Sequence, residues 1–197
     1  MVNRRLAYFL FLFVVLVLSG CETKQAPQYH ATDITGVDYG RDFRLTDQTG
    51  KVRTLADFRG KVVAIFFGYT HCPDVCPTTL SDFAMAMKLL GKDAAKVQVI
   101  FVTVDPERDT RAVLARYVPA FNPSFLGMYT SPADTAALAK SFNIFYQKQP
   151  PDGHGDYTVD HSAGTYIYDP QGRLRLYMAY GQGPQSIAHD LDLLLKN

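Results

Sequence analysis

Two cysteines and one histidine in this sequence have the residue types for soft-metal binding or thiol chemistry. Cys72 and Cys76 are separated by three residues, and His161 stands far along the chain between Asp160 and Ser162. Thiolates are both nucleophiles and soft-metal ligands, so the cysteine pair alone does not separate a redox enzyme from a metal-binding protein. Two thiolates and an imidazole form a low-coordinate set that suits copper, whereas Zn(II) normally requires a fourth ligand.

The cysteine pair lies between a predicted central strand and a predicted helix. The continuous apolar run from Lys61 to Phe67 is typical of a strand that is buried on both faces. Past Pro77, apolar residues recur at helical spacing as far as Leu90, and Gly91 suits a helix C-terminus. Unpaired amides and the helix dipole at such a junction favour thiolate, so we expect cysteine pKa values below the usual ~8.5. A structural disulfide is the plain alternative, but it would rarely be placed at so exposed a junction.

The remaining elements predict an α/β fold of the thioredoxin-like type, with an N-terminal β-hairpin and a central mixed sheet flanked by helices. The order is strand, helix, strand, helix, and then a hairpin and a closing helix. In such a sheet, the start of the strand that runs from Ser162 to Tyr168 lies beside the cysteine loop, which would bring His161 to the pair. The segments that support this order are a hairpin from Asp42 to Leu55, a strand from Val97 to Val104, a helix from Thr110 to Tyr117, a strand from Phe125 to Tyr129, a helix opened by Ser131-Pro132-Ala133-Asp134, a loop from Gln147 to Asp156, a second hairpin strand from Arg173 to Tyr180 after the turn Asp169-Pro170-Gln171-Gly172, and a helix from Pro184.

The N-terminus has the features of a lipoprotein signal peptide. Arg4 and Arg5 precede an apolar run from Leu6 to Leu18, which as a helix would reach only about 20 Å of a ~30 Å hydrocarbon core. Leu18-Ser19-Gly20-Cys21 resembles a bacterial lipobox, so we expect cleavage of residues 1–20 and lipidation of Cys21. The alternative is an uncleaved anchor with a free Cys21. Either way, the rest of the chain is expected on the membrane, facing the periplasm or extracytoplasmic space.

Residues 21–39 are polar and lack an apolar period, so we interpret them as a tether, with one domain from 40 to 197. Without residues 1–20, 18 basic side chains face 19 acidic ones, and this balance argues against nucleic acid as a partner. With Cys21 committed to lipid, only Cys72 and Cys76 remain, in a compartment that usually permits disulfides. They are available to each other or to a metal ion.

Three motifs together resemble the SCO/SenC family of copper chaperones. They are Cys72-Pro73-Asp74-Val75-Cys76-Pro77, Val104-Asp105-Pro106-Glu107-Arg108-Asp109-Thr110 and Asp160-His161-Ser162. The resemblance begins at about Gly40 and implies that Cys72, Cys76 and His161 bind Cu(I) and Cu(II). It also implies copper delivery to cytochrome c oxidase subunit II, or preparation of that copper site by reducing its cysteines. The copper donor stays unidentified. The resemblance implies a metallochaperone rather than an enzyme.

Other polar residues near the motifs have simpler interpretations. We expect Asp74 to cap the following helix, and Asp105, Glu107 and Asp109 to lead into the next one, because they lack the glycine and final acid of a calcium loop. His71 either supplies positive potential to Cys72 or is a partly exposed neighbour. His154 lies in a polar loop, where a solvated histidine is the expected interpretation and transient metal contact is the alternative. His30 in the tether and His189 on the last helix give no metal-binding signal, and the methionines form no cluster.

The main alternative function is an extracytoplasmic thiol-disulfide oxidoreductase, in which Cys72 attacks and Cys76 resolves the mixed disulfide. Thioredoxin-type enzymes carry a proline before the strand that faces the cysteines, and here that approach reads Thr158-Val159-Asp160-His161. The missing proline favours metal binding. A peroxidase is a third interpretation, supported only by the N-terminal hairpin, and no clear basic residue accompanies the cysteine motif.

Overall fold

A computed structural model describes residues 27–196 of the chain. The predicted signal peptide and Cys21 lie outside the described residues. Within the described part, no helix combines the length and apolar character that a membrane crossing requires.

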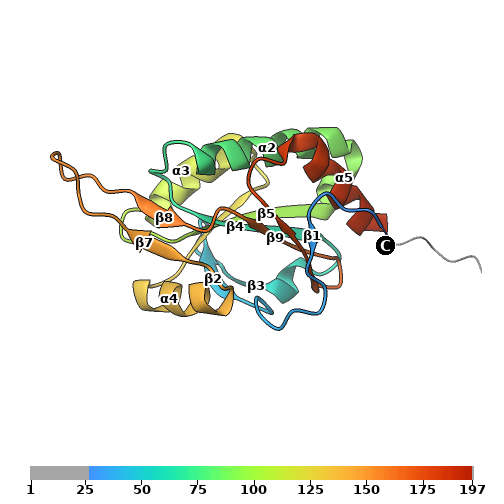
Figure 1. Cartoon of the computed structure of the whole chain (residues 1–197), viewed down its shortest axis with the longest axis horizontal. Coiled ribbons are helices and arrows are strands. Elements are labelled where there is room, and N and C mark those ends of the chain that lie inside the picture. The colour runs from blue at the N-terminus through green and yellow to red at the C-terminus, as the bar shows by residue number, and fades with distance from the viewer. Residues whose placement is uncertain (1–26, 197) are drawn as a thin grey trace, which may run out of the picture.

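The described chain forms one mixed eight-stranded sheet with helices on both faces (Figure 1). The strands follow the order β1-β10-β9-β4-β5-β6-β2-β3, in which β4, β5 and β6 are parallel and the other neighbouring pairs are antiparallel. The strands are β1 (Thr32–Asp33), β2 (Arg44–Asp47), β3 (Val52–Thr54), β4 (Val62–Gly68), β5 (Val97–Thr103), β6 (Leu126–Tyr129), β9 (Thr165–Tyr168) and β10 (Leu174–Met178). The predicted α/β class, the N-terminal hairpin β2–β3 and the central mixed sheet are confirmed.

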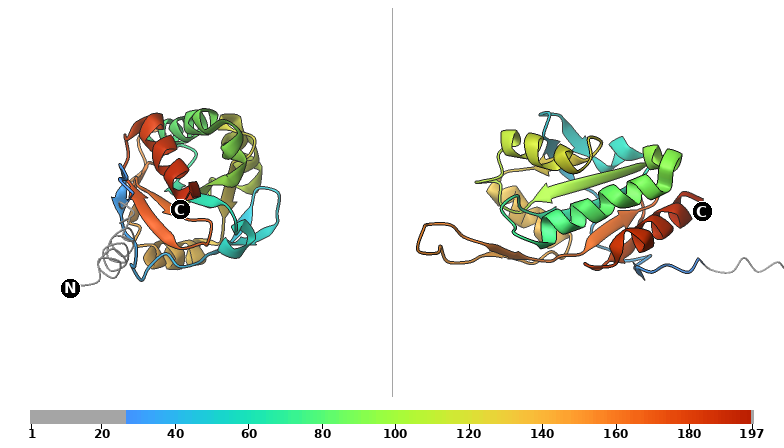
Figure 2. Two further views of the ribbon diagram at one scale, coloured as in Figure 1. Left: turned by 90° about the vertical axis from the view of Figure 1, so that its right-hand side faces the viewer. Right: turned by 90° about the horizontal axis from the view of Figure 1, so that it is seen from above.

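Three helices cover one face of the sheet and one covers the other (Figures 1 and 2). The covering helices on the first face are α2 (Val75–Leu90), α3 (Arg111–Phe121) and α5 (Gly183–Lys196), and α4 (Pro132–Ser141) lies on the second. Two short 3-10 helices, η1 (Leu55–Phe58) and η2 (Gly91–Lys96), complete the set. Helix α3 continues one turn beyond the predicted end at Tyr117 and contains Pro119, which falls in its last turn.

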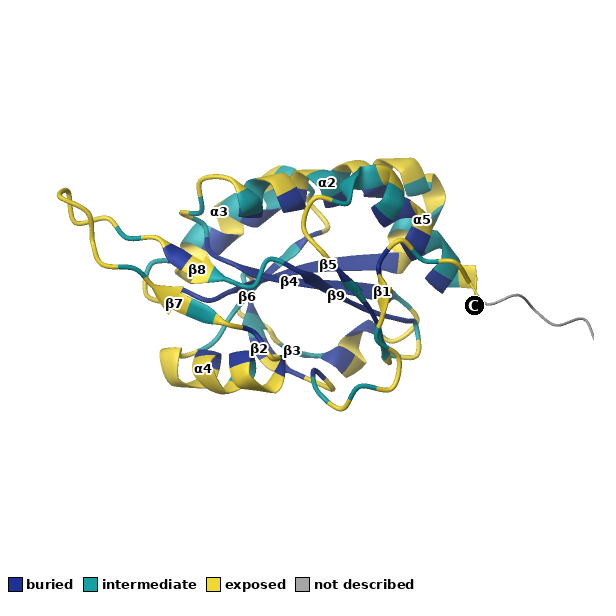
Figure 3. Ribbon diagram, in the orientation of Figure 1, coloured by how far each residue is buried: buried dark blue, intermediate teal, exposed yellow. Residues whose placement is uncertain are grey.

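The core is centred on β4 and β5, as the burial colours show in Figure 3. All seven residues of each strand are buried, because helices cover both faces of this parallel pair. Short-range hydrogen bonds mark the helix starts and turns around this core. Ser131 caps α4 by accepting a hydrogen bond from the Asp134 N–H at 3.1 Å, as predicted. The predicted turn after β9 closes with a 2.8 Å bond from the Gly172 N–H to the Asp169 carbonyl.

Part of the segment that was interpreted as a tether contacts the domain. Thr32 and Asp33 pair with β10, and the N–H groups of His30 and Ala31 donate to the buried carboxylate of Asp190. Ala31 is buried. Backbone pairing with a sheet edge does not require an apolar period, and so the polar composition of this segment did not indicate it.

The region around His161 differs from the predicted single strand between Ser162 and Tyr168. His161 ends β8 (Val159–His161), which pairs with β7 (Tyr146–Lys148) in a separate two-stranded sheet. Strand β9 starts only at Thr165. The β7–β8 hairpin extends away from the body of the domain in Figure 1. Strand β7 falls partly within the predicted Gln147–Asp156 loop, because three residues are too few to show a strand period.

Candidate metal centre

The cysteine loop joins the C-terminal end of β4 to the N-terminus of α2, as predicted. Cys72 lies in the loop and is partly exposed, whereas Cys76 lies in the first turn of α2 and is completely buried. The backbone N–H of Cys76 points at the Cys72 sulfur, 3.5 Å away. Both cysteines are free thiols, and their sulfurs lie within 4.8 Å of each other at this junction.

His161 reaches this pair from the end of β8. Its Nε2 atom lies 3.5 Å from the Cys76 sulfur, and one ligand atom from each of Cys72, Cys76 and His161 lies within 4.8 Å of the others. The other ring nitrogen, Nδ1, lies 3.0 Å from the Ser162 carbonyl oxygen and must donate a proton to it. This assignment leaves the lone pair on Nε2, directed at the cysteines.

Burial sets the charge of the centre when no metal is bound. Desolvation raises the pKa of the Cys76 thiol well above its usual value, which corrects the expectation that the helix N-terminus lowers it. Desolvation likewise lowers the pKa of His161. At neutral pH, Cys76 is therefore a neutral thiol and His161 a neutral imidazole. A bound cation must displace the Cys76 proton, and so its affinity should fall as the pH falls.

Gly68, the last residue of β4, leaves the space that Cys76 occupies. A Cβ atom at this position would lie 2.7 Å from the Cys76 sulfur and 2.9 Å from the Phe101 ring. Real Cβ atoms essentially never approach heavy atoms so closely. The absence of a side chain at Gly68 therefore allows the Cys76 sulfur to lie where it does.

Two buried aspartates hold the loops around the centre, a role that the sequence analysis missed. Asp109 has no exposed surface and accepts hydrogen bonds from the Thr70 N–H at 2.9 Å, the Thr70 hydroxyl and the Thr103 hydroxyl at 2.6 Å. These bonds attach the cysteine loop to the end of β5. Asp109 was expected only to lead into α3, and its sequence neighbours gave no sign that its partner would be Thr70.

Asp105 performs the matching role for the hairpin that carries His161. Its carboxylate is buried and pairs with Arg108, and the Tyr157 hydroxyl donates to it at 2.9 Å. The Arg108 guanidinium stacks 3.5 Å from the centre of the Tyr157 ring and donates to the Tyr157 carbonyl at 2.8 Å. Lys148 of β7 lies 3.5 Å from the same carboxylate. The hairpin is thus anchored to the loop after β5.

The remaining predicted residues stay outside the centre. Asp74 occupies the N-cap position of α2, but its side chain accepts no backbone hydrogen bond there, so the predicted cap is absent; it accepts only from the Thr78 hydroxyl, at 3.3 Å. His71 is half exposed and lies 3.9 Å from an Asp109 oxygen. His154 lies in the exposed hairpin loop. In residues 27–196, neither His71 nor His154 belongs to a potential metal-ligand group.

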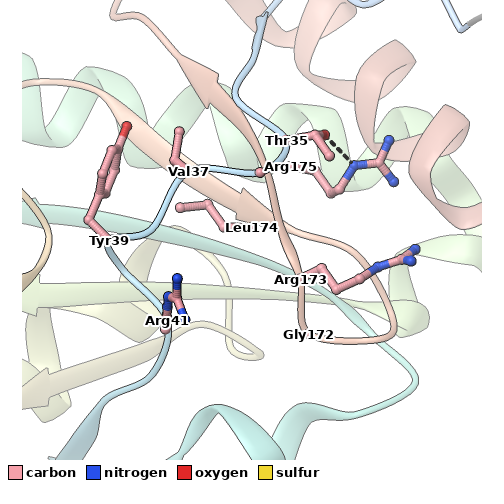
Figure 4. A pocket seen from close by; sticks show the side chains of 9 residues that line it. Thr35, Val37, Tyr39, Arg41, Gly172, Arg173, Leu174 and Arg175 are labelled. Carbon is pink, nitrogen blue, oxygen red and sulfur yellow. Dashed lines mark hydrogen bonds between the residues drawn. The ribbon is translucent and has the colours of Figure 1, made fainter.

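A surface pocket lies elsewhere, between the N-terminal segment and the β9–β10 hairpin (Figure 4). Val37 and Leu174 line its apolar part. Arg173 and Arg175 extend away from these residues, and both pair with Asp169 while Arg175 also donates to Thr35. Both guanidinium groups therefore already pair with a carboxylate of the domain. The pocket shares no residue with the cysteine centre.

Known proteins resemble this chain in sequence and in fold. The bovine mitochondrial protein SCO2 homolog (Bos taurus) is 41% identical over 148 residues, which cover 74% of this chain and 56% of that protein. The chain thus spans a little over half the length of this curated relative. The structure of Bradyrhizobium japonicum ScoI with copper bound is 43% identical and has a TM-score of 0.73, covering 80% of this chain and 99% of ScoI.

The solution structures of apo Sco1 from Thermus thermophilus agree with this result. They are 41% identical with a TM-score of 0.75, and they cover 86% of this chain and 98% of that one. These likenesses confirm the predicted thioredoxin-like fold. The SCO1/SenC family model matches residues 31–196, which include the strand-forming part of the predicted tether, the cysteine loop and His161. The chain belongs to the SCO1/SenC family.

Proposed function

We propose that this chain binds one copper ion through the thiolates of Cys72 and Cys76 and the Nε2 atom of His161, and that it carries copper as cargo. The observation that supports this most directly is the approach of the three ligand atoms to within 4.8 Å of one another. Two sulfurs and one nitrogen suit Cu(I), which accepts soft ligands and low coordination numbers. Relatives with this fold and copper bound support the same assignment.

We further propose that the recipient is cytochrome c oxidase subunit II, to which the chain delivers copper or whose copper site it prepares. This step rests on membership of the SCO1/SenC family and on the role that the three sequence motifs imply. Lipidated Cys21 would hold the domain at the membrane, facing the periplasm or extracytoplasmic space, where an oxidase subunit presents its ligands. The copper donor stays unidentified.

Thiol-disulfide exchange is the second candidate function. The difference in exposure between the two thiols favours it, because Cys72 is partly exposed to a partner while Cys76 is buried and could resolve a mixed disulfide. The raised pKa of Cys76 opposes fast exchange, since the resolving thiol must lose its proton before it attacks. Reduction of target cysteines and copper delivery would use the same two sulfurs.

Replacing His161 with alanine tests the ligand set. We expect wild-type protein in its reduced form to bind one copper ion per chain, and His161→Ala to change the Cu(II) spectrum and lower the Cu(II) affinity by more than about tenfold. Removing a residue that supports a metal ligand typically lowers metal affinity about 10–100-fold, and removing a ligand itself should lower it further. Cu(I) should remain on the two thiolates. Titration followed by absorption spectroscopy measures both quantities.

His154→Ala is the matched control, because this histidine lies in an exposed loop and should leave the copper spectrum unchanged. If His161→Ala binds Cu(II) with the wild-type spectrum and affinity, the assignment of the third ligand is wrong. A stoichiometry well below one copper ion per chain in the reduced wild type would contradict the copper-binding proposal itself.

Gly68→Ala should disturb the centre without removing a ligand. The added methyl group would overlap the Cys76 sulfur, so either the helix start or the sulfur must move. Overpacking of this kind costs about 1–3 kcal/mol, and we expect a lower melting temperature together with weaker copper binding. Gly153→Ala is the control, because a Cβ atom there meets nothing within 4 Å. Wild-type stability and copper affinity in Gly68→Ala would show that the site tolerates movement of Cys76.

A further inference from the structure

A second group of side chains of metal-ligating types lies where the N-terminal segment meets α5. One ligand atom from each of His30, His189 and Asp190 lies within 4.8 Å of the others. The two imidazole rings stand edge to face with their centroids 4.7 Å apart, and both are exposed. Figures 1 and 2 show the N-terminal segment (blue) running beside α5 (red). The two histidines are 159 positions apart in the sequence, and only the fold brings them together.

Asp190 holds both histidines in place. Its Oδ1 atom accepts the His30 backbone N–H at 3.0 Å and lies 2.9 Å from Nδ1 of His189, while Oδ2 accepts the Ala31 N–H at 2.8 Å. Because a carboxylate accepts hydrogen bonds, Nδ1 of His189 carries a proton, and the ring offers a metal ion its Nε2 atom. A carboxylate behind an imidazole is the arrangement that orients metal-ligating histidines and raises their basicity.

The charge of this group also favours a cation. Asp190 is completely buried, and burial of a carboxylate is costly unless an opposite charge pairs with it, even where it accepts hydrogen bonds as it does here. Within residues 27–196, His189 is the only basic side chain within 4.0 Å of this carboxylate. A metal ion bound by the ring of His189 would strengthen the hydrogen bond that Nδ1 of this ring donates to the carboxylate. The same ion would link the segment before β1 to α5.

We propose that His30 and His189 bind a divalent ion of borderline softness, Cu(II) or Zn(II), with Asp190 as the positioning carboxylate. Imidazole nitrogen suits both ions, and the group has no sulfur to favour Cu(I). The site is therefore chemically distinct from the centre at Cys72, Cys76 and His161. The exposure of both rings leaves the remaining coordination positions to water, so the ion should exchange readily. This inference does not depend on the proposed function.

The test uses the full-length chain with the first centre removed by Cys72→Ser, Cys76→Ser and His161→Ala. We expect this background to bind one Zn(II) or Cu(II) ion per chain in equilibrium dialysis with metal analysis. Adding His30→Gln and His189→Gln should lower the affinity for either ion by at least about tenfold. In the Cu(II) form, the electron paramagnetic resonance spectrum should show imidazole nitrogen, and the same pair of substitutions should remove it.

The matched control removes the same number of histidines at positions outside the group, His71→Gln and His154→Gln, and should keep the bound ion. His30→Gln alone guards against misfolding, because the bonds to Asp190 use its backbone and survive the substitution. The proposal is overturned if the background binds no ion at micromolar free metal. It is also overturned if the chain with His30→Gln and His189→Gln binds as tightly as the background, or if only the control pair loses the ion.

Discussion

Oxidation of Cys72 and Cys76 to a disulfide is expected to abolish tight copper binding. The bond consumes both sulfur ligands, each sulfur losing its proton and the pair giving up two electrons to the oxidant, and of the proposed ligands it leaves only the His161 imidazole. Mutating a residue that supports a metal ligand can already lower metal affinity about 10–100-fold. Because oxidation removes two ligands, we expect copper affinity to fall by more than about 100-fold. The two sulfurs lie within 4.8 Å of each other, so a small movement of the first turn of α2 closes the bond.

The measurement compares the Cu(I) affinity of the protein before and after treatment with a dithiol-specific oxidant, with a competing chelator to set the free copper. Cys21→Ser in the starting chain confines the reaction to Cys72 and Cys76, the only other cysteines. Reduction with a small dithiol should restore binding completely. Equal Cu(I) affinity in the oxidised and reduced chains would show that the cysteines are not the principal ligands.

The proximity of Cys72 and Cys76 could be predicted from the sequence because it follows local rules. A buried strand, a short loop and a helix opening bring Cys72, in the loop, close to Cys76, in the first turn of the helix. His161 was placed correctly beside them but for an incomplete reason. It was assigned to the start of the strand ending at Tyr168, whereas it ends β8 in a separate hairpin, and long-range pairing with β7 decides its position.

Features that depend on contacts across the chain were not predictable. The role of Asp109 rests on Thr70, and the grouping of His30 with His189 rests on a two-residue strand at the sheet edge. The predicted low pKa of Cys76 was wrong for a related reason. A helix N-terminus is visible in a sequence, but the burial of Cys76 between β4 and α2 is not, and desolvation outweighs the favourable dipole there.

In the cell, Cys72→Ser should lower cytochrome c oxidase activity strongly when copper is scarce. The substitution removes the accessible sulfur of the pair, through which either copper transfer to a recipient or attack on its disulfide would begin. Serine keeps the shape of the loop, and Cys72 is only partly buried, so the domain should remain folded. Oxidase activity of isolated membranes, measured against the amount of the protein present, gives the size of the effect.

Two additions to the growth medium separate the roles that the same sulfurs could play. Extra copper should partly restore oxidase activity if delivery is lost, because mass action then loads the oxidase without a carrier. A small-molecule thiol should restore it instead if the chain normally reduces the cysteines of the recipient. His161→Ala refines this distinction, since it weakens copper binding while leaving both thiols for exchange. Normal oxidase activity in the Cys72→Ser strain, together with misfolding of other extracytoplasmic disulfide proteins, would replace copper delivery with general thiol exchange.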